Sequence, residues 1–371
     1  MMSRHVSVWA LSLGLVMAAC SGRVDVGVEP GASGSSAGGG VDGSNTTAGA
    51  GSAPVAGTGA VGATDDGTPN RCSFFPLETS DPPPRLSSAD ALARIYQFLE
   101  NDPTIPNVAL PNEPTPAWAA ARANDILDEH EASGTPAPGL ARFLEHWLSV
   151  MPDELEAPAV WALKLVASDA TLSTLLAEPT GQPHRFGILN EAEVLAARPG
   201  ITVRGGLISG SVLCQPVPAP PPEFAHPIDL GPSDTTTTRR QRLERSIANP
   251  SCAGCHSLAD ASGYSLEHFD EAGDYRDLDN GQPVDATGTL NSPPISFEDY
   301  ADLGPQLATS CEAAHCLSTL LGRDAFGADF WAGQGPLSEA EVNAIARDFV
   351  ASGYSIRALV DAIVGSPSFL H

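Results

Sequence analysis

Cys252, Cys255 and His256 are the residues whose types and spacing most directly indicate chemistry. They belong to the segment Ser251-Cys252-Ala253-Gly254-Cys255-His256, a CxxCH motif. Two thiols three positions apart lie on one side of a helical turn, so both can form thioethers with the vinyl groups of one porphyrin. The imidazole of His256 then lies beneath the ring and can bind the iron. The motif therefore predicts one covalent c-type haem with His256 as the proximal ligand.

The two thiols also allow other interpretations. A thioredoxin-like CxxC requires a strand leading into a helix, which Asn249-Pro250 after an arginine-rich segment does not supply. A zinc site would combine the two thiols with Cys311 and Cys316, although thiolate zinc sites are commoner in reducing compartments. A simple disulfide between Cys252 and Cys255 is a further alternative.

The second axial position of the iron has several candidates. No methionine follows Met151, so a downstream methionine ligand is excluded. His268 is the nearest histidine after the motif, and we take it as the candidate distal ligand, with His315 and His371 behind it. If none of them binds, the iron is five-coordinate or borrows Met151 or another residue of the N-terminal part. An open position would permit small-ligand or peroxide chemistry.

Arginines near the motif are candidates for pairing with haem propionates. Arg276, beside Tyr275, is one such candidate. A second group of arginines precedes the motif: Arg239, Arg240, Arg242 and Arg245. These side chains could pair with propionates or could equally form a solvated helix face.

The N-terminus has the features of an export signal. An apolar run over Val6–Ala18, too short to span a membrane, is followed by Ala19-Cys20. Small residues directly before a cysteine match the lipobox of bacterial lipoproteins, in which that cysteine is diacylated. We therefore predict a signal peptide over 1–19 and a lipid anchor at Cys20; the alternative is an ordinary signal peptide cleaved near Ala19.

A linker follows the anchor. Residues 23–70 contain no Leu, Ile, Met or aromatic residue and are rich in Gly, Ala, Ser and Thr, so they cannot form a core. We predict that 20–70 is a disordered tether that holds the folded part at the outer membrane. The folded part would then be either periplasmic or exposed at the cell surface.

The seven cysteines are an odd number, which these assignments explain. Lipid takes Cys20 and haem takes two more, which leaves four for disulfides in an oxidising compartment. Cys311 and Cys316 would point about 140° apart on a helix, so each is expected to bond elsewhere. We favour Cys214 with Cys316 and Cys72 with Cys311, although sequence alone leaves three connectivities open.

The apolar periodicity predicts a mainly helical, bundle-like fold with few short strands. Ser87 with Asp90, Thr115-Pro116, and Ser338 with Glu341 mark helix starts. The helices that begin after Ser87 and Ser338 have an apolar face. The stretches Leu140–Met151 and Ile356–Val364 have the same periodicity. Further helices are predicted over Ala159–Ala177, Glu191–Ala197, Arg239–Ala248 and Pro305–Gly322.

Two loop signals divide the folded part. Pro216–Pro222 is too proline-rich for helix, so 216–234 is predicted to be an extended strap between an N-terminal helical lobe (71–215) and a haem-binding lobe (235–371). Asn280-Gly281 predicts a hairpin turn between Tyr275–Leu278 and Pro283–Ala286.

The charge of the chain limits its partners. Forty-five acidic residues against 19 basic ones give a net charge of −26, which argues against nucleic acid. Such a protein attracts cationic partners at long range, so a cationic redox protein would fit; solubility alone explains the charge equally well.

The chain from about Leu86 onward resembles the planctomycete-type cytochrome c proteins, which are also abundant in myxobacteria. The resemblance runs through short blocks in order, among them Arg204-Gly205, Val212–Gln215, the CxxCH motif, Gly263–Glu267, Tyr275-Arg276, Leu321–Arg323 and Ser366–Phe369. It implies haem c at Cys252, Cys255 and His256 and structural roles for Cys214 and Cys316. The chain departs from the family at Ala261, where a proline is common, and at His268, where Asn is frequent.

Taken together, the sequence predicts an exported lipoprotein with one covalent haem that transfers electrons rather than catalyses a reaction. A haem enzyme or ligand sensor with an open distal site is the alternative. A non-haem structural module with zinc or a disulfide at the CxxC is the third hypothesis.

Overall fold

The computed structural model describes residues 72, 74, 84–149, 155–217, 236–248, 250–330 and 335–371. The signal segment, Cys20, the linker, Met151 and most of the proline strap lie outside these residues. The described part is mainly helical with a few short strands, which confirms the predicted fold class.

Three helices open the described chain: α1 (Ser88–Glu100), α2 (Pro116–Ser133) and α3 (Pro138–Trp147). The hydroxyl of Ser87 accepts a hydrogen bond from the Asp90 amide, and that of Thr115 accepts one from the Trp118 amide. Such caps satisfy amides that have no partner within the helix. Both helix starts were correctly predicted.

Two long predicted helices each divide in two. The span 159–177 is α4 (Ala157–Leu165) and α5 (Leu172–Leu176), and the span 305–322 lies within α10 (Tyr300–Ala308) and α11 (Cys311–Ala325). The predictions were wrong because hydroxyl caps start new helices. The Thr171 and Thr174 side chains cap each other's backbone amides, and Ser310 accepts a hydrogen bond from the Ala313 amide.

The segment before the strap contains four short elements: η1 (Ile188–Asn190), α6 (Ala192–Ala196), α7 (Ile201–Leu207) and the π-helical turn η2 (Ile208–Val212). Sequence periodicity did not predict α7 or η2. Glycine disfavours helix, and this stretch contains four, at 200, 205, 206 and 210.

The motif-bearing segment consists of α8 (Arg239–Ser246), α9 (Pro250–Gly263) and η4 (Tyr264–Leu266). Two small antiparallel hairpins follow: β1 (Leu278–Asp279) with β2 (Gln282–Pro283), and β3 (Gly288–Asn291) with β4 (Pro294–Phe297). Asn280 and Gly281 have φ angles of 50° and 76° at the predicted turn. The hairpin arms are shorter than predicted.

The chain closes with α12 (Glu339–Ala351), α13 (Ile356–Val364) and α14 (Pro367–Leu370). As predicted, Ser338 and Glu341 form a capping box. These helices pack against α1, α2 and α11, so one hydrophobic cluster extends from Ala91 to Leu370 and includes residues of both predicted lobes. The division at the strap stays a prediction.

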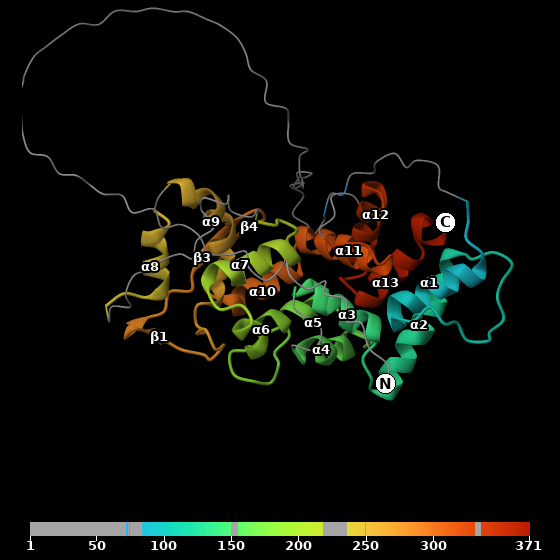
Figure 1. Ribbon diagram of the computed structural model, residues 1–371, viewed down its shortest axis with the longest axis horizontal. Helices are drawn as coiled ribbons and strands as arrows, with labels where there is room; N and C mark the ends of the chain where they lie inside the picture. The colour runs from blue at the N-terminus through green and yellow to red at the C-terminus, as the bar shows by residue number, and fades with distance from the viewer. Residues whose placement is uncertain are drawn as a thin grey trace, which may run out of the picture.

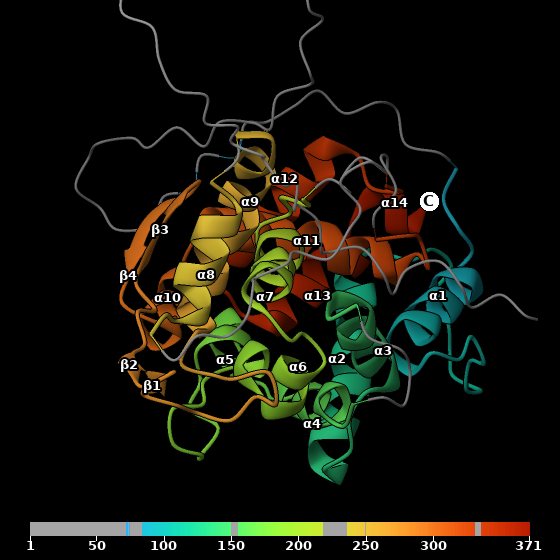
Figure 2. The same ribbon diagram turned by 60° about the vertical axis from the view of Figure 1, so that its left-hand side comes forward.

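The motif helix lies far from the first helix. In two views, α8 and α9 lie at one end of the molecule and α1 at the other (Figures 1 and 2). The helix α7 lies against α9, and α11 lies centrally. The position of α9 therefore depends on α7.

Candidate haem site

The CxxCH motif lies in the first half of α9, as a haem attachment requires. Cys252 is buried, whereas Cys255 is partly exposed and is a free thiol. Cys252 is disulfide-bonded in the structure. A thioether to haem and a disulfide exclude each other at this sulfur, so chemistry at Cys252 distinguishes the hypotheses.

His256 is held in one orientation by the next turn of its own helix. Its Nδ1 lies 3.0 Å from Oδ2 of Asp260, and both side chains are buried. The carboxylate can only accept a hydrogen bond, so Nδ1 carries the hydrogen. The lone pair is then on Nε2, the atom that would bind iron. The donor set therefore fits a haem ligand.

The helices α7 and α9 meet at backbone contact. A Cβ on Gly205 would lie 1.8 Å from the Ala259 carbonyl oxygen, and one on Gly263 would lie 2.1 Å from that of Ile201. Only glycine allows this approach. It brings the Thr202 hydroxyl of α7 to 3.5 Å from His256 Nδ1.

Buried hydroxyl groups fix α9 against α7 and the adjoining turn η2. The Ser209 hydroxyl donates to the Leu258 carbonyl at 3.0 Å, and the Ser262 hydroxyl donates to the Gly205 carbonyl at 3.0 Å. The two hydroxyls lie 3.2 Å apart. Each buried polar group thus has a partner across the interface, which sets the register of α9 on α7.

A buried ion cluster lies beyond the end of α9. Arg239 of α8 binds both carboxylate oxygens of Glu267, which is 2% exposed. Arg276 lies 3.7 Å from Glu267 and 2.8 Å from Asp279. Burial raises the pKa of the Glu267 carboxyl, and the guanidinium groups act against that shift. These arginines are engaged within the protein, so the propionate role of Arg276 stays a prediction.

The other arginines of α8 have different surroundings. Arg240 stacks over the Tyr264 ring at 3.9 Å and donates to the backbone carbonyls of Asp285 and Thr287. Arg242 and Arg245 bind Thr237. The α8 arginines therefore fix this end of the protein rather than form a fully solvated face.

Arg204 connects several segments around α9, a role that the sequence did not predict; the sequence indicated this residue only through the family resemblance. It is 1% exposed and donates to the carbonyls of Arg198, Leu266 and Phe269 at 3.0, 3.3 and 2.6 Å. It also donates to Leu195 and Asp270. Burial lowers its pKa to about 10. Its position as a lone arginine in an apolar, glycine-rich stretch could have indicated a buried structural role.

His268 lies in an aromatic stack. Its Nδ1 lies 3.0 Å from the Arg276 carbonyl oxygen, and its ring stacks on Tyr275, which in turn stacks on His184. No contact with His256 exists among the described residues. The distal role of His268 stays a prediction.

The other distal candidates lie elsewhere or outside the described residues. The ring of His315 is bonded to Asn343 at 3.1 Å and stacked on Phe74. His371 is the C-terminal residue, and Met151 lies outside the described chain. The structure does not bring His315 or His371 to the motif.

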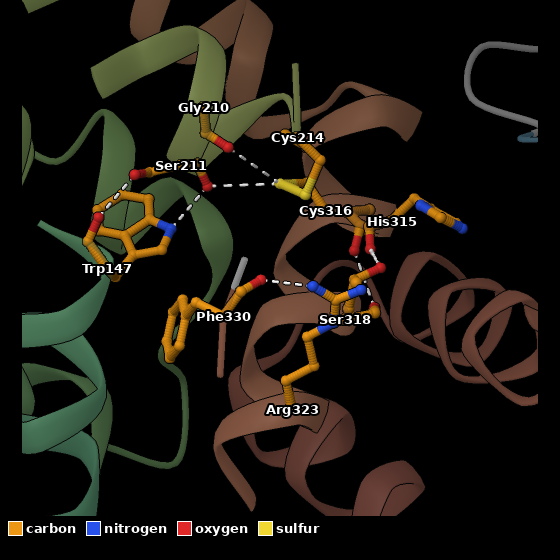
Figure 3. Close-up of a disulfide and its surroundings, with 12 residues drawn as sticks. Trp147, Gly210, Ser211, Cys214, His315, Cys316, Ser318, Arg323 and Phe330 are labelled. Atoms are coloured by element: carbon orange, nitrogen blue, oxygen red, sulfur yellow. Dashed lines mark hydrogen bonds between the residues drawn. A yellow bond between two sulfur atoms is a disulfide. The ribbon is translucent and has the colours of Figure 1, made fainter. Parts of the chain in front are cut away.

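Both favoured disulfides are present, Cys72–Cys311 and Cys214–Cys316, with Cα–Cα distances of 5.4 and 5.3 Å. This confirms the predicted pairing. Figure 3 shows Cys214–Cys316 beside Trp147 and Ser211, which exchange hydrogen bonds of 2.7 and 2.6 Å. The zinc alternative fails in the form predicted, because Cys311 and Cys316 are bonded elsewhere.

Comparison with known proteins bears on the same segment. Residues 185–279 match the model of the PSCyt3 family, described as a protein of unknown function (DUF1588). This match confirms the resemblance to planctomycete-type cytochrome c proteins. The cytochrome c-type match includes Arg204, Cys214, all of α9 and Arg276, and it leaves the resemblance of the flanking segments untested. No curated protein and no solved structure matches the chain.

The described residues contain neither a clustered metal site nor a membrane-spanning helix. No group of three or more His, Cys, Asp or Glu side chains there is arranged to hold a metal ion. Within the same residues, no helix has both the length and the apolar character needed to cross a membrane.

Proposed function

We propose that the protein is an exported, lipid-anchored electron carrier with one covalent c-type haem on α9. The observation that carries the proposal is the CxxCH motif on a helix in which Asp260 holds Nδ1 of His256 and leaves Nε2 for iron. The cytochrome c-type match over this segment supports it.

Each residue of the motif has a defined task in this proposal. Cys252 and Cys255 tether the porphyrin through thioethers, and His256 is the proximal ligand. When bound, the haem supplies a one-electron iron couple. Close packing of α7 on α9 at Gly205 and Gly263 would hold the helix that carries His256 in one position.

The experiment is maturation of the full chain in cells with haem-attachment machinery. We expect a mass gain of one haem and a reduced pyridine haemochrome with c-type bands. Replacing Cys252 and Cys255 by Ala should abolish both, whereas Ser257→Ala, on the exposed side of the same helix, should leave both intact. A colourless wild type with Cys252 in a disulfide would overturn the haem proposal and favour the non-haem module.

We also propose that lipid on Cys20 anchors the protein at the outer membrane, periplasmic or surface-exposed, and that a cationic protein exchanges electrons with it. The lipobox and the charge of −26 support these two statements. Cys20→Ala should move the protein from the membrane fraction to the soluble fraction, whereas Ser21→Ala should not. The rate of electron exchange with a cationic protein should fall as salt rises; an unchanged rate would contradict the partner class.

A haem enzyme or ligand sensor is the second candidate. It is favoured by the position of His268, which stacks on Tyr275 and has no described contact with His256. Without a second ligand the iron would be open to small molecules. Rapid binding of cyanide or carbon monoxide would support this candidate, whereas a low-spin ferric spectrum insensitive to both ligands supports electron transfer.

A further inference from the structure

Asp260 is a buried carboxylate with one hydrogen-bond partner among the described residues. Its side chain is 2% exposed, and Oδ2 accepts a hydrogen bond from His256 Nδ1 at 3.0 Å. Its other oxygen, Oδ1, is buried and has no hydrogen-bond partner among the described residues. Burying such a carboxylate is costly, so its retention calls for a role.

Two other buried carboxylates of the described chain have different surroundings. Glu267 binds Arg239 and lies near Arg276, and Asp324 lies 2.7 Å from Arg142. In these cases a guanidinium group neutralises the acid. Asp260 has no arginine or lysine within ion-pair distance in the described part, so its charge acts on the imidazole of His256, its hydrogen-bond partner. Burial and this same charge also raise the pKa of Tyr264.

We propose that Asp260 is a positioning residue that fixes the iron-binding tautomer of His256 and lowers the reduction potential of the bound haem. The inference rests on the proposed function. A carboxylate hydrogen-bonded to Nδ1 makes the imidazole more basic, which stabilises ferric iron more than ferrous iron. In the haem-loaded protein, an external reductant such as dithionite would supply the electron, and the proton would stay on Nδ1.

The helix packing keeps this pair together. Asp260 follows His256 by one helical turn, so both face α7. At the residue before Asp260, the Ala259 carbonyl oxygen lies so close to Gly205 that a Cβ there would be 1.8 Å from it, so no larger residue fits at this contact. The Thr202 hydroxyl, at 3.5 Å from the same Nδ1, is too distant for a strong hydrogen bond. Asp260 is therefore the acceptor that acts on His256.

The test is a redox titration of the matured full chain with dithionite and mediators. Asp260→Asn keeps an acceptor oxygen but removes the charge, and we expect the reduction equilibrium constant to rise about tenfold, equivalent to about 59 mV for one electron. Asp260→Glu should move the potential back toward the wild-type value. Glu244→Gln removes an exposed charge from α8 and should change the potential far less.

A second measurement needs no haem. Nitrogen NMR of His256 in the unmatured chain should show the Nδ1–H tautomer in wild type and a loss of that preference in Asp260→Ala. Equal haem content with equal potentials in wild type and Asp260→Asn would overturn the inference and leave the haem proposal standing. A wild type that takes up no haem would overturn both. An unchanged tautomer in Asp260→Ala would overturn the positioning role even if the asparagine variant failed to mature.

Discussion

The helices α9 and α13 are held in place by different forces. α13 buries five aliphatic side chains at 2% exposure or less: Ile356, Leu359, Val360, Ile363 and Val364. The apolar side chains that α9 buries among its described residues are Cys252 and Ala259, while Leu258 is 52% exposed. Its other buried side chains are polar: His256, Asp260 and Ser262.

This difference shows how a helix can be fixed without an apolar stripe. Apolar burial is non-directional and tolerates small shifts, because one aliphatic contact replaces another. Glycine contacts, serine hydrogen bonds and buried ion pairs each require one register. The helix that carries the motif is held by forces that specify position, and the helices that supply the core are held by forces that specify burial.

The ion cluster provides the strongest test of this contrast. Glu267→Ala should reduce the free energy of unfolding by about 3–5 kcal/mol, because it leaves the buried Arg239 without its carboxylate partner and leaves Arg276 with Asp279 alone. Urea denaturation of the purified full chain measures the loss. Glu271→Ala removes an exposed acid of the same segment and should change stability by less than about 0.5 kcal/mol. Equal losses of stability in the two variants would show that the ion cluster around Glu267 does not stabilise the α8 and α9 end of the protein.

The Cys214–Cys316 disulfide joins the segment after η2, which contacts α9, to α11, which contacts α13. Its removal therefore tests how the surroundings of α9 and α13 are connected. Replacing both cysteines by Ala should cost about 2–4 kcal/mol. Ser211→Ala, which removes one of the two hydrogen bonds with Trp147, should cost about 1 kcal/mol. A disulfide variant as stable as wild type would mean that packing alone secures the junction.

Helix contact at Gly205 is the next test. Gly205→Ala should destabilise the protein by about 1–3 kcal/mol, because α7 must move away from the Ala259 carbonyl. Gly254→Ala on α9 meets no atom within 4 Å and should be neutral or stabilising, since alanine favours helix. Thermal unfolding distinguishes the two variants. If Gly205→Ala were the more stable one, the close contact would not be required.

The smallest expected effect is a pH dependence in the α11 and α12 region. Burial lowers the pKa of His315 from its ordinary value of 6.5. The unfolded chain therefore binds this proton more readily than the folded chain, so stability is fully present above pH 6.5 and is lost as pH falls through the folded pKa. His315→Gln should flatten this part of the profile of unfolding free energy against pH. A profile identical to wild type would exclude His315 as its source.

The sequence by itself predicted the chemistry of the motif and several helix starts. The spacing of Cys252, Cys255 and His256 on one turn is a local property, and so are the caps at Ser87, Thr115 and Ser338. Helical geometry also argued against a bond between Cys311 and Cys316, and the structure then selected the favoured pairing from the connectivities that remained open.

Only the tertiary structure decided which groups surround the motif. The breaks at Thr171 and Ser310, the helix α7 and the cluster around Glu267 depend on contacts between residues far apart in the chain. Asp260 lies four residues after His256, but only the packing of α7 against α9 shows that its carboxylate is buried and has no arginine or lysine partner among the described residues. Burial and pairing are properties of neighbours in space, and local periodicity carries no record of those neighbours.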